Sequence, residues 1–240
     1  LYTGTDATNS THAISGIGFS PSLVWTKDRD ATYGHYLFDA VRGTGVTKGL
    51  RSNTTDDEGM ANESYDALSS FDSDGFSITG GAFGSLYQDR NNANYVAWNW
   101  KANGSGSSNT DGSITSTVSA NTDAGFSIVS YNGTEANATV GHGLSKAPEM
   151  IFTKNRGAAT NWGVYNSSMG TNKVIYLDST STADTDTAVW QNTTPTSSVF
   201  SIGNTTYANA DYDYIAYCFH SVDGYSKVGS YIGNNNANGT

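Results

Sequence analysis

An internal repeat restricts this chain to folds that can be built twice. The stretches from Pro21 to Ser52 and from Pro148 to Ser179 match without a gap at a constant spacing of 127 residues. Each contains a Thr-Lys-x-Arg element, written "LVWTKDRD" in the first copy and "MIFTKNRG" in the second. Self-similarity at a fixed spacing indicates repeated structural units. We therefore predict a tandem duplication.

Further matches set the expected boundaries. "DGFSIT" answers to "SVFSIG", "NYVAWNWK" answers to "DYIAYCFH", and the opening "LYTGTDA" matches both "SYNGTEA" and, near the end, "SYIGNNNANGT". We predict a first unit at residues 1–103, a flexible linker at 104–121, a second unit at 122–226 and the opening strand of a third unit at 227–240. Because the chain begins inside an expected strand, we expect it to be part of a longer polypeptide.

The composition predicts an all-β fold. Aromatic residues make up 12% of the chain and charged residues only 14%, with 27 glycines among many Ser, Thr and Asn residues. Aromatic residues favour strands, whereas Gly and Asn favour turns. We expect each unit to be a β-sandwich with jelly-roll or lectin-like connections. The triplets Val96, Trp98, Trp100 and Ile215, Tyr217, Phe219 share a face at strand spacing and are the expected core anchors.

Charge and cysteine content exclude several classes of protein. The formal net charge is −10, which repels nucleic acid, and there is no Lys/Arg cluster to reverse it locally. No apolar run approaches the ~18 residues of a membrane-spanning helix, so we predict no membrane insertion. The single cysteine, Cys218, cannot form an internal disulfide and is expected to be a small buried hydrophobic residue.

The Thr-Lys-x-Arg element allows four interpretations. In the first, Lys27, Arg29 and His35, with Lys154, Arg156 and Trp162 in the matching places, form ligand sites for acidic or hydroxylated sugars. The second is structural, with Lys27 and Arg29 paired to local acids such as Asp28, Asp30 or Asp39. In the third the element lies on a contact between subunits, and in the fourth it persists through duplication alone. The structural interpretation outweighs the ligand site.

Signals for catalysis and metal binding are weak. The four histidines are scattered, so no zinc site is predicted. Asp56, Asp57 and Glu58 form an oxygen-rich cluster of the kind that holds Ca²⁺, but the spacing of an EF-hand is missing, so solvated acids are the preferred interpretation and no cofactor is expected. A glycosidase needs two carboxylates flanking the bond, and the two units share no such pair. We predict that the protein is not an enzyme.

Several long strings resemble one known family. "GIGFSPSLVWTKDR", "LFDAVRG", "YVAWNWKANG", "AGFSIVSYNG" and "YIAYCFHSVDGYSKVGSY" are similar to a repeated domain of virion proteins of tailed bacteriophages, especially those of marine and cyanobacterial phages. The resemblance covers nearly the whole chain, with the strings in the family's order. It implies a tail-fibre or other appendage protein with no assigned activity, made in the host cytoplasm and carried on the virion.

The functional expectation is therefore a structural module of a phage virion that contributes to attachment to host-surface glycans. Expected partners are other virion subunits, including further copies of the same chain. A soluble carbohydrate-binding lectin is the alternative from another class. A polysaccharide depolymerase is the weaker alternative.

Overall fold

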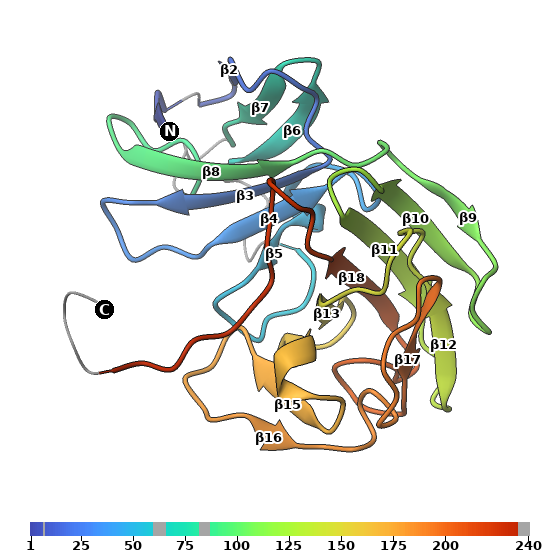
Figure 1. Cartoon of the computed structure of the whole chain (residues 1–240). Helices are drawn as coiled ribbons and strands as arrows, with labels where there is room; N and C mark the ends of the chain where they lie inside the picture. The colour runs from blue at the N-terminus through green and yellow to red at the C-terminus, as the bar shows by residue number, and fades with distance from the viewer. Residues whose placement is uncertain (7, 60–65, 82–86, 235–240) are drawn as a thin grey trace.

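The computed structural model describes residues 1–6, 8–59, 66–81 and 87–234, and these residues form an all-β protein (Figure 1). The named strands pair antiparallel throughout, and the only helices in the described ranges are the short 3-10 turns η1 (Val46–Lys48) and η2 (Ser167–Met169). The predicted all-β class is confirmed. No helix of the described ranges is long and apolar enough to cross a membrane.

The first region contains a five-stranded sheet in the order β1-β8-β3-β4-β5 and a three-stranded sheet in the order β2-β7-β6. Its strands are β1 (Tyr2–Thr3), β2 (Thr11–Ser15), β3 (Leu23–Asp28), β4 (Tyr36–Asp39), β5 (Leu50–Arg51), β6 (Ala67–Asp72), β7 (Gly75–Thr79) and β8 (Asn94–Trp100). Both sheets lie in the upper half of Figure 1.

The second region contains an eight-stranded sheet in the order β16-β15-β14-β13-β18-β11-β10-β9 and the pair β12-β17. Its strands are β9 (Ser107–Asn109), β10 (Ser116–Asn121), β11 (Phe126–Asn132), β12 (Ala138–Gly141), β13 (Met150–Asn155), β14 (Gly163–Asn166), β15 (Lys173–Tyr176), β16 (Asp184–Thr185), β17 (Val199–Ile202) and β18 (Asp213–Phe219). These strands occupy the right-hand and lower parts of Figure 1.

The two regions share one strand order. The first has β1-β8-β3-β4-β5, and the second contains β11-β18-β13-β14-β15. The register matches as well: Leu23 lies opposite Trp100, and Met150, 127 residues later, lies opposite Phe219. The stretches from Pro21 and from Pro148 therefore begin in equivalent positions of their sheets. This correspondence supports the predicted duplication, which remains our interpretation of the repeat.

The match weakens at the last shared pair of strands. Leu37 lies opposite Leu50, whereas Val164 lies opposite Ile175, two residues before the equivalent of Leu50. Alternation of side chains along a strand means that a two-residue shift preserves which residues face the same side. The chain that follows β15 is therefore displaced along the sheet without being turned over.

Three apolar clusters hold the strands together. One lies inside the first region and includes Phe38 and Phe76, and another lies inside the second and includes Ile151 and Phe200. The third cluster joins the two regions, because Leu23 and Leu50 pack there with residues of the second region. Since a buried aromatic or aliphatic side chain contributes about 1.5–3 kcal/mol, the shared cluster ties the regions into one body.

The expected anchor triplets differ in their outcome. Ile215, Tyr217 and Phe219 all belong to the cluster between the regions, together with Trp100. Trp98 instead is 46% exposed, because its end of the sheet has no layer over it. The prediction was wrong for Trp98.

The predicted linker and the predicted third unit also have defined positions. Residues 104–121 contain β9 and β10, which extend the eight-stranded sheet beyond β11. Residues 227–234 form no strand, and Tyr231 and Ile232 are more than 90% exposed. The remainder of the predicted opening strand, residues 235–240, lies outside the described residues.

Cys218 lies in β18 with no exposed surface. It packs in the apolar cluster of the second region, as its aromatic surroundings in the sequence predict. Burial raises the pKa of its thiol to about 12, although a hydrogen bond with Ser127 opposes the shift. The thiol is therefore a packing group in this fold.

Candidate functional site

The two Thr-Lys-x-Arg elements end β3 and β13 in the same backbone turn. The side-chain oxygen Oδ1 of Asp28 accepts hydrogen bonds from the amides two and three residues further on, and Oδ1 of Asn155 does the same. The amides of Arg29 and Arg156 also donate to equivalent carbonyls on β8 and β18, each at 2.8 Å. An Asx turn fixes both arginines in the same backbone position.

The second element is covered by the docking loop, which we define as residues 50–59 of the first region. Lys154 is fully buried, and its Nζ donates to the carbonyl oxygen of Thr55 in the docking loop at 2.9 Å and to that of Thr160 at 2.5 Å. Trp162 is also fully buried, and its Nε1 donates to the carbonyl oxygen of Arg51 at 2.9 Å. Neither side chain has exposed surface for a ligand in this structure.

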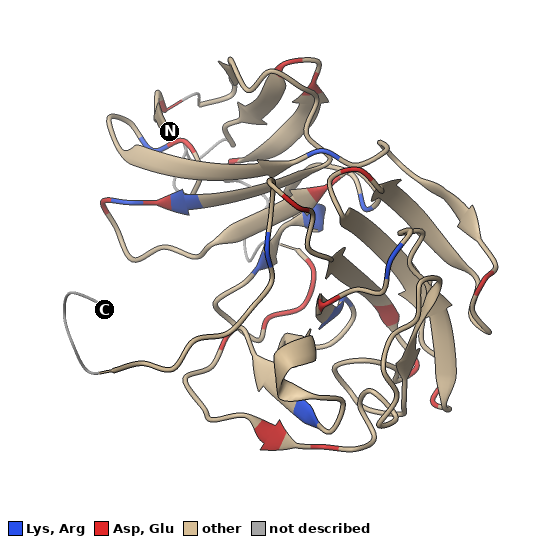
Figure 2. Cartoon of the chain, in the orientation of Figure 1, with Lys and Arg blue, Asp and Glu red and all other residues tan. Residues whose placement is uncertain are grey.

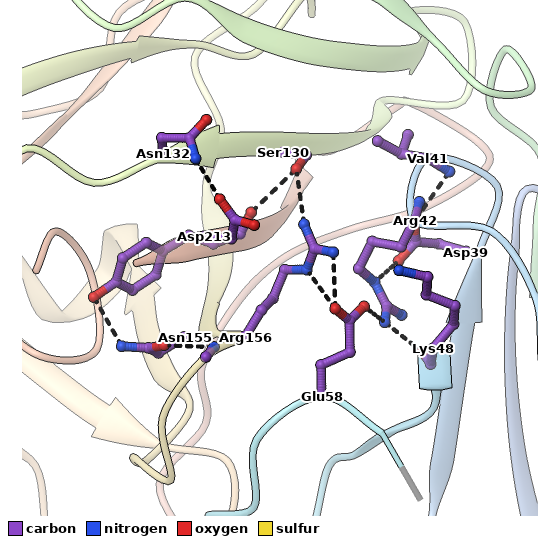
Figure 3. Close-up of polar contacts among 12 residues, drawn as sticks. Asp39, Val41, Arg42, Lys48, Glu58, Ser130, Asn132, Asn155, Arg156 and Asp213 are labelled. Carbon is purple, nitrogen blue, oxygen red and sulfur yellow. Dashed lines mark hydrogen bonds and ion pairs between the residues drawn. The ribbon is translucent and has the colours of Figure 1, made fainter. Parts of the chain in front are cut away.

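A buried ion-pair network completes this contact (Figure 3). Both Nε and Nη2 of Arg156 donate to Oε2 of Glu58 in the docking loop, at 3.0 and 2.8 Å. The other carboxylate oxygen of Glu58 accepts from Nη1 of Arg42 at 2.9 Å, and Arg42 Nε donates to Asp39 at 2.6 Å. Tyr217 adds a hydrogen bond to Asp39 at 2.7 Å, so side chains of both regions share the network.

The charges in this contact are strongly perturbed. Burial would lower the pKa of the Arg42 guanidinium, but Asp39, Tyr217 and Glu58 outweigh it and raise that pKa above its ordinary value. Burial lowers the pKa of the Lys154 ammonium to about 8, because the acids around it only partly compensate. Buried charges of this kind persist only where partners satisfy them.

The first element has no such cover. Nζ of Lys27 donates to the carbonyl oxygens of Asp28 and Ala31 in its own turn. The side chain of Arg29 is exposed and has no hydrogen bond or ion pair with any residue that the structure describes. His35 takes the place of Trp162 and is half-buried, and burial, followed by the charge of Lys27, lowers the pKa of its imidazole.

These positions bear on the six predicted ligand residues. Lys154, Arg156 and Trp162 lie together on a contact between regions, and Lys27, Arg29 and His35 keep accessible surface. The acids proposed as local partners are used otherwise: Asp28 pairs with Arg90 at 3.1 Å and Asp39 with Arg42. The ligand role of the six residues remains a prediction, and the second copy fits the contact interpretation.

The acidic cluster is engaged by arginines. Asp56 pairs with Arg51 at 2.8 Å, and Glu58 pairs with both Arg42 and Arg156. Asp57, between them, is exposed. Within the described residues, no group of three or more His, Cys, Asp or Glu side chains is placed to hold a metal ion.

An open groove lies where the two regions meet on another face. It has a volume of about 710 Å³ and is lined by the rings of Phe19 and Tyr225 and by the amides of Asn99, Asn103 and Asn121. Lys101 and Asp123 add one charge of each sign. Tyr225 is 71% exposed, so the face of its ring is open to a ligand.

The amides of the groove are unequally committed. Asn121 Nδ2 donates to the carbonyl oxygen of Lys101, and its Oδ1 accepts from the amide of Ala124, which fixes the side chain in the groove wall. Oδ1 of Asn99 is buried and has no hydrogen-bond partner among the described residues. A buried unpartnered carbonyl is costly, so it favours a ligand that donates a hydrogen bond.

The groove was not predicted from the sequence. Its lining comes from the loop before β3, the end of β8, the β10–β11 turn and the segment after β18. No spacing in the sequence brings these four segments together. The only available signal was the polar and aromatic composition of "WNWKANG" and "VDGY".

Comparisons with known proteins give one type of information. The family described as a domain of unknown function (DUF7483) matches residues 1–240. No curated protein and no solved structure matches the chain.

Proposed function

The chain belongs to the DUF7483 family of domains of unknown function, and from that premise we propose that it is a structural module of a phage virion appendage that contributes to attachment by binding a host-surface glycan in the open groove. The carrying observation is the groove itself, with exposed aromatic rings beside uncommitted amides. The phage assignment is supported by the sequence resemblance.

The chemistry of the groove favours a neutral, hydroxyl-rich ligand. Aromatic faces pack on the apolar face of a sugar ring, while amide groups both donate to and accept from hydroxyls. Tyr225 and Phe19 supply the rings, and Asn99 and Asn103 supply amides. The single Lys and single Asp of the lining cancel in formal charge, so the groove does not select an ion.

The rigid contact between the regions supports a structural role. The docking loop, the ion-pair network and the shared apolar cluster hold both sheets in one arrangement. A repeated module that transmits force along a fibre requires such a contact, because a flexible joint would bend. Self-association of identical modules is part of the proposal.

The groove also favours binding over cleavage. A glycosidase uses two carboxylates on either side of the scissile bond, separated by about 5–9.5 Å. Among the residues lining the groove, Asp123 is the only carboxylate. A depolymerase is therefore the weaker candidate, and sizing host polysaccharide before and after incubation with the protein tests it directly.

Glycan binding is tested with the whole chain on an array of bacterial surface glycans. We expect binding that falls at least about tenfold in Tyr225→Ala, because an aromatic packing face is lost. Tyr231→Ala is the matched control, since Tyr231 is an exposed tyrosine on the same terminal segment and outside the groove. Binding that is equal in both variants contradicts the proposed site.

The virion assignment has a separate test. Mass spectrometry of purified particles of the phage that carries the gene should find peptides of this chain in an assembled appendage. A virion without the polypeptide contradicts the structural role, even if glycan binding is observed; that outcome favours the soluble lectin.

A further inference from the structure

We propose that the Lys27–Arg29–His35 surface binds the acidic segment Asp178–Asp186 of a second copy of this chain, so that copies associate head to tail. The inference goes beyond the proposed function, because such association needs no glycan. It rests on a contact that the molecule already makes once, between its own two regions.

The existing contact supplies the pattern. The docking loop of the first region meets the Thr-Lys-x-Arg element of the second through Thr55 and Glu58, which bind Lys154 and Arg156. The amide of Glu58 also donates to the carbonyl oxygen of Arg156 at 3.0 Å. Backbone and side chain of the same loop residue therefore bind one arginine.

The first region presents the same element without the loop. Its strands have the same order and register, and both lysines and both arginines lie 127 residues apart. Arg29 is exposed and has no partner among the described residues. His35, at the position of Trp162, carries a ring N–H that can replace the indole donor.

The second region presents the matching acidic segment. A shift of 127 residues takes Glu58 to Thr185, which lies between Asp184 and Asp186. Asp186 accepts from the hydroxyl of Tyr207 at 2.6 Å, so it is committed to its own region. Asp184 is exposed on β16, which makes it the acid that faces a partner.

The charges of the surrounding surface are compatible with this pairing. Besides Lys27 and Arg29, the surface includes Arg90, whose side chain is 35% exposed while it pairs with the buried Asp28. The carboxylate of Asp30 is the nearby exposed acid, and it is occupied by the amide and side chain of Asn94. Lys27 and Arg29 thus outnumber the exposed acid, which favours a negatively charged partner.

Two elements of one chain cannot satisfy each other in this arrangement. Figure 2 shows the charged end of β3 at the upper left and the acidic β16 at the bottom of the same view. Elements that are separated in a projection are at least that far apart in space. A contact of one surface with a different surface of the next copy repeats without closing on itself, and so builds rings or filaments.

Sedimentation velocity of the purified chain tests the inference. We expect the mean mass to rise above that of the monomer between about 10 and about 500 µM, the range of a small polar contact. Arg29→Ala and Asp184→Asn should each raise the required concentration at least about tenfold, and added salt should act in the same direction. Asn at 184 retains a partner for Tyr176, with which Asp184 interacts.

Mixing the variants gives the decisive measurement. Arg29→Ala keeps an intact Asp184, and Asp184→Asn keeps an intact Arg29, so an equimolar mixture should form dimers and stop there. Lys101→Ala, which removes an exposed cation on a different surface, should associate like the unmodified chain. Circular dichroism checks that each variant is folded.

Three results overturn the inference: an unmodified chain that remains monomeric throughout, variants that associate normally, or a mixture that behaves like either variant alone. A monomer whose sedimentation coefficient falls in Arg29→Ala overturns it as well, because the contact then lies within one chain. Tyr225→Ala should associate normally, so failure of the glycan site and failure of self-association are distinguished.

Discussion

The two regions repeat the same strands but use one of them differently. At the end of β13 the Thr-Lys-x-Arg element is buried under the docking loop, while at the end of β3 the same element faces solvent. The turns and backbone hydrogen bonds of both are the same. The comparison shows that the local sequence sets the conformation, and that the covering segment sets what the side chains do.

Another difference lies beneath the element. Asp28 forms an ion pair with Arg90, whereas Asn155, its equivalent, donates to the hydroxyl of Tyr214 at 3.1 Å and to the carbonyl oxygen of Thr206 at 3.0 Å. Both side chains keep an oxygen for the turn. The second region thus holds the turn without a charge, which suits a site that another segment covers completely.

The largest effect is expected from Arg42→Met, which introduces the residue that the second region has at this position, Met169. The guanidinium is lost while Asp39 stays fully buried without its cation. Removing one partner of a buried pair costs about 3–5 kcal/mol. Urea unfolding should show this loss, and Met169→Leu should change the unfolding free energy by less than about 1 kcal/mol. A loss equal in both variants would remove the asymmetry.

Exchanging the aromatic position of the element should have the next largest effect. Trp162→His deletes a fully buried ring and should cost about 3 kcal/mol, since large-to-small changes in a core leave a cavity. His35→Trp places the indole where no loop covers it, so a change within about 1 kcal/mol is expected. Thermal unfolding of both variants measures the difference. Equal losses would mean that the two positions are equally covered.

A pH dependence distinguishes the two lysines. In the folded chain, burial lowers the pKa of Lys154 from 10.5 to about 8, so the unfolded chain binds more protons between these values. Stability should therefore rise with pH, by about 1.5 kcal/mol between roughly pH 8 and 9.5. Chemical denaturation across this range should show the rise in the unmodified chain and in Lys27→Met, and not in Lys154→Met. A flat profile in the unmodified chain contradicts the burial of a charged ammonium.

The repeat in the sequence predicts the shared strands well, because hydrophobic alternation and turn residues are local properties. The equivalence of Leu23 with Met150 and of Trp100 with Phe219 follows from spacing alone and agrees with the observed register. Spacing also places both Thr-Lys-x-Arg elements at strand ends. What covers each element depends on residues about a hundred positions away.

The contact between the regions shows why the site was harder to predict. Glu58 binds Arg156, 98 residues later, and Trp162 binds the carbonyl oxygen of Arg51, 111 residues earlier. Neither pair follows from a periodic pattern. The exposure of Trp98 has the same origin, because its equivalent Tyr217 is buried by Asp39 and Arg42 from the other region.

The chemical silence of Cys218 has a practical consequence. Its thiol is fully buried and resists deprotonation at neutral pH, so maleimide dyes and spin labels will not modify it in the folded chain. Cysteines introduced on the surface can be labelled selectively without first deleting the native one. Fluorophores near β3 and β16 would then report energy transfer between copies as they assemble.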